Sequence, residues 1–232
     1  MSALCFEHVS FGYLGQELLL SDVNFSLEKG TCTLLEGPSG SGKSTICHLA
    51  CGIIPRNFGG KLEGRILLDG EPLPDKPELI AGKVGIVFQN PETQLFLPYV
   101  EDELAFGPEN FCMSPEKIEE RISNTLKEVG IEGLRYKKTN ELSGGQKQLV
   151  AIASVHTLAP EVLILDEVMS QLDGSSTKRI RELIAKLREE GNTLLLVDHD
   201  LEDKSMVDQI LRVTKSGIVC SEGVPGYANR RK

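Results

Sequence analysis

The sequence of 232 residues predicts an α/β fold whose central sheet is mainly parallel. Short apolar segments, each typical of a buried strand, recur along the chain, and segments with helical spacing lie between them. One of these strands leads directly into a glycine-rich loop that a helix follows. Strands of a parallel sheet are covered by helices on both faces, so they read as near-continuous apolar runs. The composition, 40% hydrophobic and 25% charged, is ordinary for a globular α/β protein.

The strand-like segments are short, apolar and bounded mostly by glycine or aspartate. They predict strands at residues 31–36, 65–68, 84–88, 163–166, 193–198, 209–213 and 218–220. One helix is expected over 44–54, after the glycine-rich loop. Another is expected over 175–190, which carries apolar residues at helical spacing, namely Ile180, Leu183, Ile184 and Leu187.

The stretch from about residue 90 to residue 155 has much helical pattern and almost no strand pattern. Ser114 and Pro115 suit an N-cap followed by proline at the first helical position. The apolar face of that helix is formed by Ile118, Ile122, Leu126 and Val129. A second helix is expected from Gly144 to about Leu158. We therefore predict a helical subdomain at 90–155, inserted into an α/β core formed by 1–89 and 156–232.

Charge and cysteine content narrow the class of function. The net charge of −9 argues against a nucleic-acid partner, because phosphate backbones attract clustered Lys and Arg. A solvated tail explains the basic cluster Arg230-Arg231-Lys232. Six cysteines without a Cys-x-x-Cys pair favour buried free thiols over a zinc site. The sequence shows neither a secretion signal nor a membrane-spanning run, so we expect a cytoplasmic protein.

The glycine-rich loop fits the pattern G-x-x-x-x-G-K-[ST], in the strand-to-helix context that this pattern requires. Its glycines let backbone N–H groups approach a phosphate, and the helix N-terminus adds partial positive charge. Lys43 can bridge the β- and γ-phosphate oxygens of ATP, and the Ser44 hydroxyl can coordinate Mg²⁺. The predicted nucleotide-binding residues are Gly37, Pro38, Ser39, Gly40, Ser41, Gly42, Lys43, Ser44 and Thr45.

Two acidic residues end the predicted strand 163–166. Asp166 should emerge at the carboxyl edge of the sheet, beside the phosphate loop, where it can hold Mg²⁺ through water. Glu167 follows directly and can polarise the attacking water. The alternative, that both residues only cap a strand, is weakened by the complete phosphate loop upstream.

The run Leu142-Ser143-Gly144-Gly145-Gln146 is the most specific feature of the chain. Ser143 is a natural N-cap for the helix that follows. Capping does not explain Gly144 and Gly145, because glycine destabilises a first helical turn. We interpret the paired glycines as room for an anion close to backbone N–H groups. Since the chain already has its own phosphate loop, the expected anion is the γ-phosphate of ATP bound to a second subunit.

Together these motifs resemble the nucleotide-binding subunit of ATP-binding cassette (ABC) transporters, over essentially the whole chain. Leu142–Gln146 matches the signature motif of that family without a change. The resemblance implies a P-loop ATPase fold with a mainly parallel core sheet, an antiparallel β part near the N-terminus and the inserted helical subdomain. It also implies a dimer, homomeric or with a second ABC ATPase, in which two ATP–Mg²⁺ lie between the phosphate loop of one subunit and the signature of the other.

The resemblance implies roles for four further residues. Gln89, after strand 84–88, matches the glutamine loop, which contacts Mg²⁺, the attacking water and the membrane partner. His199 matches the switch histidine, which contacts the γ-phosphate. Asp173 matches the acidic member of a loop that crosses the dimer interface. Tyr13 matches the aromatic residue that stacks on adenine, although an isolated aromatic residue is more often part of a core.

Two stretches, 53–62 and 87–107, are similar to the ATPases of energy-coupling factor importers, which take up vitamins and transition-metal ions. This similarity implies two partners, a transmembrane coupling protein and a substrate-binding membrane protein, and a position at the cytoplasmic face of the membrane. Residues 90–96 would then lie where the ATPase meets the coupling protein. For Leu95 and Phe96 the alternative is an ordinary place in the core.

Two departures from the family pattern lie next to predicted site residues. Val168-Met169 stands where the family usually has Pro-Thr after the catalytic glutamate, and Leu149 stands where it usually has arginine. These departures motivate an alternative function, a regulatory or catalytically weak cassette paired with a stronger one. Non-transport cassettes of DNA repair or translation are less favoured, because the chain has neither basic patches nor a second set of motifs.

Overall fold

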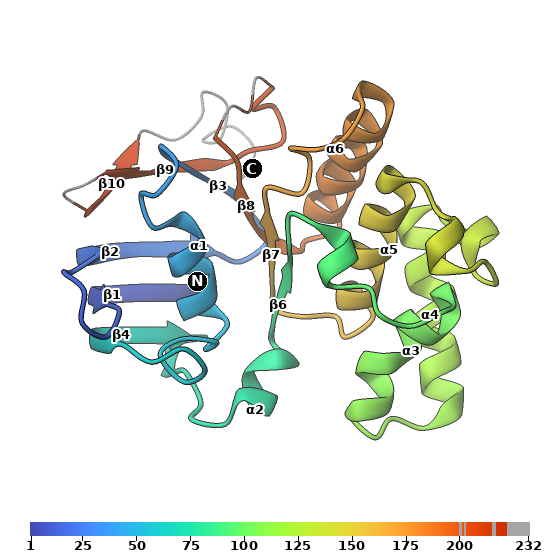
Figure 1. The fold of residues 1–232 in the computed structure, drawn as a ribbon, viewed down its shortest axis with the longest axis horizontal. Coiled ribbons are helices and arrows are strands. Elements are labelled where there is room, and N and C mark those ends of the chain that lie inside the picture. Colours follow the sequence, from blue (N-terminus) through green and yellow to red (C-terminus); the bar gives the residue numbers. More distant parts are fainter. Residues whose placement is uncertain (200, 202, 215–216, 222–232) are drawn as a thin grey trace.

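The sheet that carries the phosphate loop has six strands in the order β10-β9-β3-β8-β7-β6. The computed structural model describes residues 1–199, 201, 203–214 and 217–221 (Figure 1). Neighbouring strands are parallel except β9 and β10, which confirms the predicted mainly parallel sheet. The strands are β3 (Cys32–Glu36), β6 (Val84–Val87), β7 (Val162–Asp166), β8 (Thr193–Val197), β9 (Gln209–Thr214) and β10 (Gly217–Ser221).

The register of this sheet brings three chain segments to one level. Leu35 on β3 and Asp166 on β7 both pair with Val197 on β8. Because carboxyl ends of parallel strands meet at one edge, the segments that leave β3, β7 and β8 start side by side. Those segments hold the phosphate loop, Glu167 and His199.

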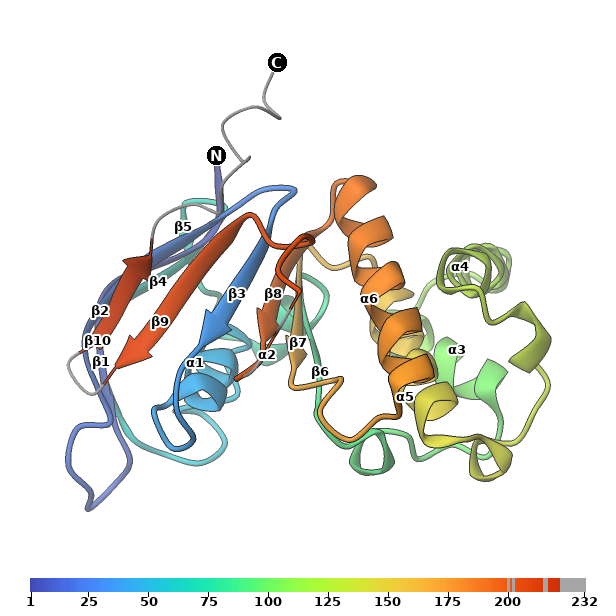
Figure 2. The same cartoon turned by 90° about the horizontal axis from the view of Figure 1, so that it is seen from above.

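A second sheet is antiparallel, with the order β2-β1-β4-β5. Its strands are β1 (Ser2–Gly12), β2 (Leu20–Glu28), β4 (Lys61–Leu68) and β5 (Glu71–Pro72). Helix α1 (Lys43–Ala50) lies between the two sheets (Figures 1 and 2). Phe6 and Phe25 stack with ring centroids 4.5 Å apart, and they share one core with Ile46 and Leu49 of α1.

Helices α3 to α6 cover the opposite face of the parallel sheet (Figure 2). Helix α6 (Gly174–Glu189) and helix α5 (Gly144–His156) lie against the sheet, and α3 (Val100–Asn110) and α4 (Pro115–Val129) pack beyond α5. Leu194 and Leu196 of β8 are fully buried in the core that these helices close. Each such side chain stabilises the fold by about 1.5–3 kcal/mol relative to an exposed one.

The structure confirms the predicted helices, and some of them end at other residues than predicted. The Ser114 hydroxyl accepts a hydrogen bond from the Lys117 N–H at the start of α4, and three of the four predicted face residues (Ile122, Leu126 and Val129) are buried. The helix predicted over 44–54 ends at Ala50, because Gly52 takes a φ of 65° that a helix does not allow. The helix predicted to reach Leu158 ends at His156.

Three strands of the antiparallel sheet, namely β1, β2 and the two-residue β5, were not predicted from the sequence pattern. A shift in register between Phe6 and Val9 of β1 breaks the alternation by which a strand is recognised. The strand predicted from Arg65 begins earlier, at Lys61. Strand β4 pairs with β1 along most of its length, and such long-range pairing leaves no local signal.

The described cysteines Cys5, Cys32, Cys47, Cys51 and Cys112 are free thiols. Burial raises the pKa of Cys32 and of Cys51 to about 12, so both thiols stay protonated at neutral pH. The basic cluster Arg230-Arg231-Lys232 and the side chain of Cys220 lie outside the described residues.

Candidate functional site

The phosphate loop joins β3 to α1 and depends on glycine at both of its ends. A Cβ at Gly37 would lie 2.7 Å from the carbonyl oxygen of Val213 on β9, so only glycine fits this approach. Gly42, the N-cap of α1, has a φ of 99°, which L-residues rarely adopt. The sequence pattern therefore has a steric cause in this chain.

Lys43 is buried at the first turn of α1, and its charge is held within the loop. Its Nζ donates to the carbonyl oxygens of Gly37 at 2.8 Å and of Pro38 at 3.2 Å. A cavity of about 240 Å³ is formed by the loop, the start of α1, Leu19 and Glu167. The structure thus brings the predicted phosphate ligands and the predicted catalytic carboxylate to one cavity.

Asp166 is the last residue of β7 and is buried beside the phosphate loop. Burial raises the pKa of Asp166, and a hydrogen bond with the Ser44 side chain opposes that rise. A hydroxyl and a carboxylate in contact make an oxygen-only donor set, which suits Mg²⁺ because this cation prefers oxygen ligands. The residues present fit the metal that the sequence predicts.

Three predicted catalytic residues meet after β6, β7 and β8. Gln89 Nε2 donates to Glu167 Oε2 at 3.2 Å and to the Ser170 hydroxyl at 3.0 Å. His199 Nδ1 lies 3.9 Å from Glu167 Oε1. Glu167 has a φ of 50°, a conformation that turns the chain out of the strand direction and is often found where function constrains the backbone.

Ser170 is a part of this cluster that sequence reasoning missed. It lies 81 positions from Gln89, and only the pairing of β6 with β7 brings the two together. Serine in a loop is common, so the pattern held no signal for this contact.

Tyr13 follows β1 and lies near the end of the phosphate loop. Its hydroxyl is 3.3 Å from Thr45 Oγ1, and its ring meets Phe11 edge-on with centroids 5.0 Å apart. The side chain is half-buried and borders a cavity of about 370 Å³ with Leu14 and Lys61. This place next to the loop suits both a structural contact and an adenine platform.

The signature run Leu142–Gln146 forms the start of α5. The Ser143 hydroxyl accepts from the Gln146 N–H at 3.3 Å, and Gln146 Oε1 accepts from the Ser143 N–H at 3.0 Å. This is a capping box, which satisfies two backbone donors that a helix start leaves free. Leu142 is buried and anchors the turn in the core.

The two glycines of the signature run are explained by different constraints. A Cβ at Gly145 would lie 2.2 Å from the Ser176 hydroxyl of α6, whereas a Cβ at Gly144 would meet no heavy atom within 4 Å. The single explanation predicted from the sequence, room for an anion, is therefore incomplete for Gly145, because the packing of α6 already excludes a side chain there. Gly144 keeps open space over the helix start, as that explanation requires.

Asp173 is the N-cap of α6. Its carboxylate accepts from the backbone N–H groups and the hydroxyls of Ser175 and Ser176 at 2.6–3.0 Å. These hydrogen bonds, that of the Ser175 hydroxyl first, lower the pKa of Asp173 to about 2. The residue that the sequence places at a subunit interface thus also has a local role that sequence reasoning missed.

The signature and the phosphate loop do not meet within one chain. None of the residues that line the phosphate-loop cavity comes from Leu142–Gln146. Gly144 instead borders a separate cavity of about 210 Å³, together with Gln89, Lys147 and Val168. The helix that the signature begins lies on the opposite face of the sheet from α1 (Figure 2).

A sequence profile described as ABC transporter matches residues 20–170, well over half of the chain. The chain belongs to the ABC transporter family. Proteins of this family bind and hydrolyse ATP, which is the activity that the phosphate loop and Glu167 of this chain predict. Among the described residues, no helix is both long enough and apolar enough to cross a membrane.

Relatives of this chain include transporter ATP-binding proteins of Methanosarcina. The energy-coupling factor transporter ATP-binding protein EcfA of Methanosarcina acetivorans is 40% identical over 94% of this chain and 78% of its own length. An ABC transporter ATP-binding protein of Methanosarcina mazei is 42% identical over 95% of this chain. This chain spans 38% of that protein's length, and 36% of the length of a similar protein of M. acetivorans.

Solved structures share the fold. CbiO1 of Clostridium perfringens, part of the ABC transporter complex CbiONQ, superposes with a TM-score of 0.87 at 31% identity, over 99% of this chain and 91% of that one. The ADP conformation of MJ1267, an ATP-binding cassette of an ABC transporter, has a TM-score of 0.82 at 26% identity, over 98% and 92%. The predicted ABC ATPase fold is confirmed.

The two departures from the ABC pattern are both buried. Val168 and Leu149 are 1% and 2% exposed and belong to the core around α5 and α6. An arginine in place of Leu149 would put a charge into that core, so leucine at this position suits the packing of this chain.

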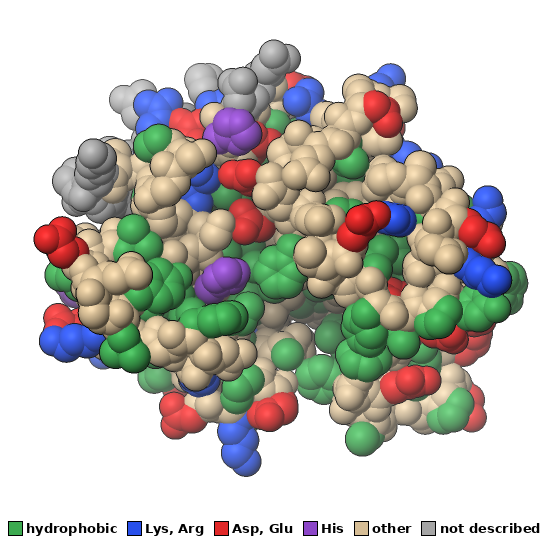
Figure 3. Space-filling view, in the orientation of Figure 1, with side chains coloured by type: hydrophobic (Ala, Val, Ile, Leu, Met, Phe, Trp, Pro, Cys, Tyr) green, Lys and Arg blue, Asp and Glu red, His purple; other side chains and the backbone are tan. Residues whose placement is uncertain are grey.

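An apolar cavity of about 340 Å³ opens between α2 (Pro77–Ala81), α3 and the end of α5. Hydrophobic side chains gather around the hollow between α2 and α3 (Figure 3). Phe96 is 62% exposed and meets Phe106 edge-on, with ring centroids 4.8 Å apart. Leu95 instead packs against the core. The alternative of ordinary core therefore holds for Leu95 and not for Phe96.

A buried carboxylate supports the wall of this cavity. Glu103 Oε2 accepts from the N–H groups of Phe96 at 3.1 Å and of Leu97 at 2.8 Å. Burial raises the pKa of Glu103, and the two backbone donors oppose that rise. The turn that carries Phe96 is thereby fixed to α3.

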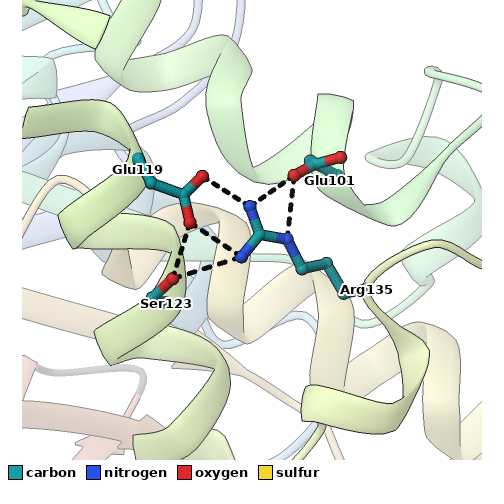
Figure 4. Close-up of polar contacts among 4 residues, drawn as sticks. All are labelled: Glu101, Glu119, Ser123 and Arg135. Atoms are coloured by element: carbon teal, nitrogen blue, oxygen red, sulfur yellow. Dashed lines mark hydrogen bonds and ion pairs between the residues drawn. The ribbon is translucent and has the colours of Figure 1, made fainter. Parts of the chain in front are cut away.

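Arg135 lies in the segment that leads to the signature run, and it connects this segment to α3 and α4 (Figure 4). Its guanidinium donates to Glu101 of α3 at 2.8 Å, to Glu119 of α4 at 2.9 Å and to Ser123 at 3.2 Å. Hydrogen bonds with Glu119 and Glu101 raise the pKa of Arg135, although its partial burial opposes them. One arginine therefore joins two helices of the helical region to the loop that precedes Leu142.

Proposed function

We propose that this ABC ATPase is the ATP-hydrolysing subunit of an energy-coupling factor importer for a vitamin or a transition-metal ion. In this proposal two subunits bind two ATP between them. The observation that carries it is the separation, within one chain, of a complete phosphate site from a capped signature turn with open space at Gly144. The likeness to EcfA and to CbiO1 supports the importer class.

The phosphate loop Gly37–Thr45 would hold the triphosphate, with Lys43 as its charged ligand. Ser44, Asp166 and Gln89 would hold Mg²⁺, which neutralises phosphate charge during the reaction. Tyr13 would stack on the adenine. The buried position of Asp166 beside Ser44 supports its part in this set.

Glu167 would polarise the attacking water, and Gln89 would orient the Glu167 carboxylate through its Nε2 hydrogen bond. His199, 3.9 Å from the same carboxylate, would contact the γ-phosphate. Ser143 and Gly144 of the second subunit would complete the site, and Asp173 would lie at the interface. Closure supplies contacts that the open dimer lacks, so ATP shifts the equilibrium toward the closed dimer.

A transmembrane coupling protein would dock at residues 90–96, next to the apolar cavity, and a second membrane protein would select the substrate. The exposed Phe96 supports this surface. The helical subdomain 90–155 would then transmit closure of the dimer to the membrane partner, at the cytoplasmic face of the membrane.

Replacement of Glu167 by Gln tests the catalytic assignment. The variant should bind ATP and lose turnover by about 10²–10⁴-fold, because an amide cannot accept the proton of the attacking water. It should also accumulate as an ATP-bound dimer, measured by size-exclusion chromatography with ATP and Mg²⁺. Hydrolysis at the wild-type rate would refute the assignment.

A regulatory or catalytically weak cassette is the second candidate, because Val168 and Leu149 depart from the family pattern. Both side chains are buried core residues, and this favours the active enzyme. An ATPase assay of the purified chain, alone and with a co-purified partner, separates the two. A weak cassette would hydrolyse ATP only with a second, different ATPase subunit.

A further inference from the structure

Two residues near the start of α5, Lys147 and Gln148, contact the segment around Gln89. Lys147 Nζ lies 2.5 Å from Glu92 Oε1, and Gln148 Nε2 donates to the carbonyl oxygen of Phe88 at 3.2 Å. Both residues follow the signature run directly. The two contacts fall on either side of Gln89 along the chain.

The segment around Gln89 also contacts Glu167, the candidate catalytic carboxylate. Gln89 Nε2 donates to Glu167 Oε2 at 3.2 Å and to the Ser170 hydroxyl at 3.0 Å. Asn90 fixes the turn that follows, because its side chain accepts from the Glu92 N–H at 3.0 Å. Residues 88–92 therefore form one hydrogen-bonded turn between α5 and Glu167.

The first turn of α5 joins the signature serine to Lys147. Ser143 caps the helix, and Lys147 N–H donates to the Ser143 carbonyl oxygen at 2.8 Å, so the signature serine and Lys147 belong to one helical turn. A cavity of about 210 Å³ lies between this turn and the segment that follows Gln89, and Gly144 and Val168 border it.

The two contacts differ in exposure. The Lys147 and Glu92 side chains are 20% and 66% exposed, so a charge change at this pair is tolerated by the fold. Gln148 is 1% exposed, and within the described residues its Oε1 has no hydrogen-bond partner. Substitutions in the Lys147–Glu92 ion pair should therefore disturb the fold less than a substitution of the buried Gln148.

We infer that Lys147 and Gln148 are positioning residues that couple the two ATP sites of the dimer. This inference rests on the proposed function, in which Glu167 serves the ATP of its own chain and Ser143 serves the ATP of the partner. Residues 88–92 then join a residue of one site to the helix that contributes to the other. Hydrolysis at one site moves the Gln89 segment, and the contacts with Lys147 and Gln148 pass that movement to the second site.

Charge reversal tests the coupling by its effect on cooperativity. In the wild-type enzyme the Hill coefficient for ATP hydrolysis should lie above 1 and approach about 2, the number of sites. Lys147→Glu and Glu92→Lys should each lower it to about 1, and the double reversal should restore it, because the pair is re-formed with opposite sign. Reversal at Lys117, which pairs with Glu120 on α4 far from both contacts, is the matched control and should leave the coefficient unchanged.

Gln148→Met removes the hydrogen bond to Phe88 and keeps the side-chain volume, and it should lower the Hill coefficient in the same way. Its thermal melting curve shows whether the fold is retained. A wild-type coefficient of 1, or single reversals that keep the wild-type coefficient, would overturn the coupling while Glu167→Gln still traps an ATP-bound dimer. Failure of Glu167→Gln to form that dimer would instead refute the proposed function.

Discussion

The phosphate loop and the signature turn are both glycine-rich helix starts, and they differ in what surrounds them. At the phosphate loop the chain encloses its own site, because Lys43 is buried and a Cβ at Gly37 would meet β9 at 2.7 Å. At the signature turn Ser143 is exposed and a Cβ at Gly144 would meet no heavy atom within 4 Å. The first helix start is complete within one chain, and the second has an open side.

This difference explains why one chain would need a second copy or a relative. A helix N-terminus attracts anions through its free N–H groups, and the capping box of Ser143 and Gln146 already uses two backbone donors. Gly144 is exposed and has open space beside it, so the helix start is uncovered at this residue. The predictions that follow probe this contrast, in order of decreasing effect.

The largest effect is expected for Ser143→Arg. Its long cationic side chain would fill the open side of the signature turn, so hydrolysis by the dimer should fall by more than about 100-fold. ATP binding by the monomer should stay within about twofold, because the phosphate loop lies elsewhere in the chain. Steady-state ATPase assays and titration with a fluorescent ATP analogue measure the two effects. Loss of ATP binding in the monomer would mean that the signature acts on its own chain's nucleotide.

The paired glycines should respond in opposite ways to alanine. Gly145→Ala forces a Cβ to within 2.2 Å of the Ser176 hydroxyl, so the chain should lose about 1–3 kcal/mol of unfolding free energy. Gly144→Ala meets no such contact and should keep or slightly raise stability, because alanine favours the helix. It should still lower hydrolysis about tenfold, since the methyl group occupies the open space. Chemical denaturation with parallel ATPase assays separates the two, and equal destabilisation would contradict the contrast.

Asp166→Asn should stabilise the nucleotide-free chain at neutral pH while it abolishes hydrolysis. Burial raises the folded-state pKa of Asp166 above 3.8, so its contribution to stability is fully present below pH 3.8 and is lost as pH rises through the folded pKa. At neutral pH the buried carboxylate therefore costs stability. The gain should shrink as pH falls toward 3.8, measured as the difference in unfolding free energy between variant and wild type. A gain that does not depend on pH would contradict this account.

The smallest effect is expected for Asp173→Ala, which removes the N-cap of α6. Its melting temperature should fall by about 2–4 °C at pH 7, and Asp173→Asn should recover most of the loss. Hydrogen bonds from Ser175 and Ser176 lower the pKa of Asp173 to about 2, so its contribution is present above pH 3.8 and disappears as pH falls through about 2. Melting curves at pH 7 and pH 2 check both statements. A loss of hydrolysis much larger than this destabilisation would support the interface role.

The sequence predicted those parts of the molecule that are encoded by local pattern. The parallel strands are runs of apolar residues with clear ends, and α4 has apolar residues at helical spacing after Ser114 and Pro115, so their positions were confirmed to within a few residues. Strand β1 was missed because a shift in register after Phe6 interrupts its alternation, and β2 has a similar shift between Leu20 and Val23. The phosphate loop was recognisable because its glycines, Lys43 and Ser44 are adjacent in the chain.

The contacts that set the site could not be predicted, because they join residues far apart in sequence. The Ser170 partner of Gln89 depends on the pairing of β6 with β7, and the Ser176 neighbour of Gly145 depends on how α6 packs on α5. These two relations arise from tertiary packing, and no local motif encodes them. The cap formed by Asp173 is different, because Ser175 and Ser176 lie only two and three positions away, so the N-cap pattern could have predicted it.

A mixing experiment tests most directly whether one ATP site is built from two chains. Lys43→Ala disables the phosphate loop and Ser143→Arg disables the signature, so each variant alone should be inactive. After subunit exchange, half of the dimers contain both variants and each of these keeps one intact site, so up to about a quarter of the wild-type ATPase rate should return. No recovery on mixing, with dimer exchange confirmed by differently tagged chains, would show that the signature does not complete a partner's site.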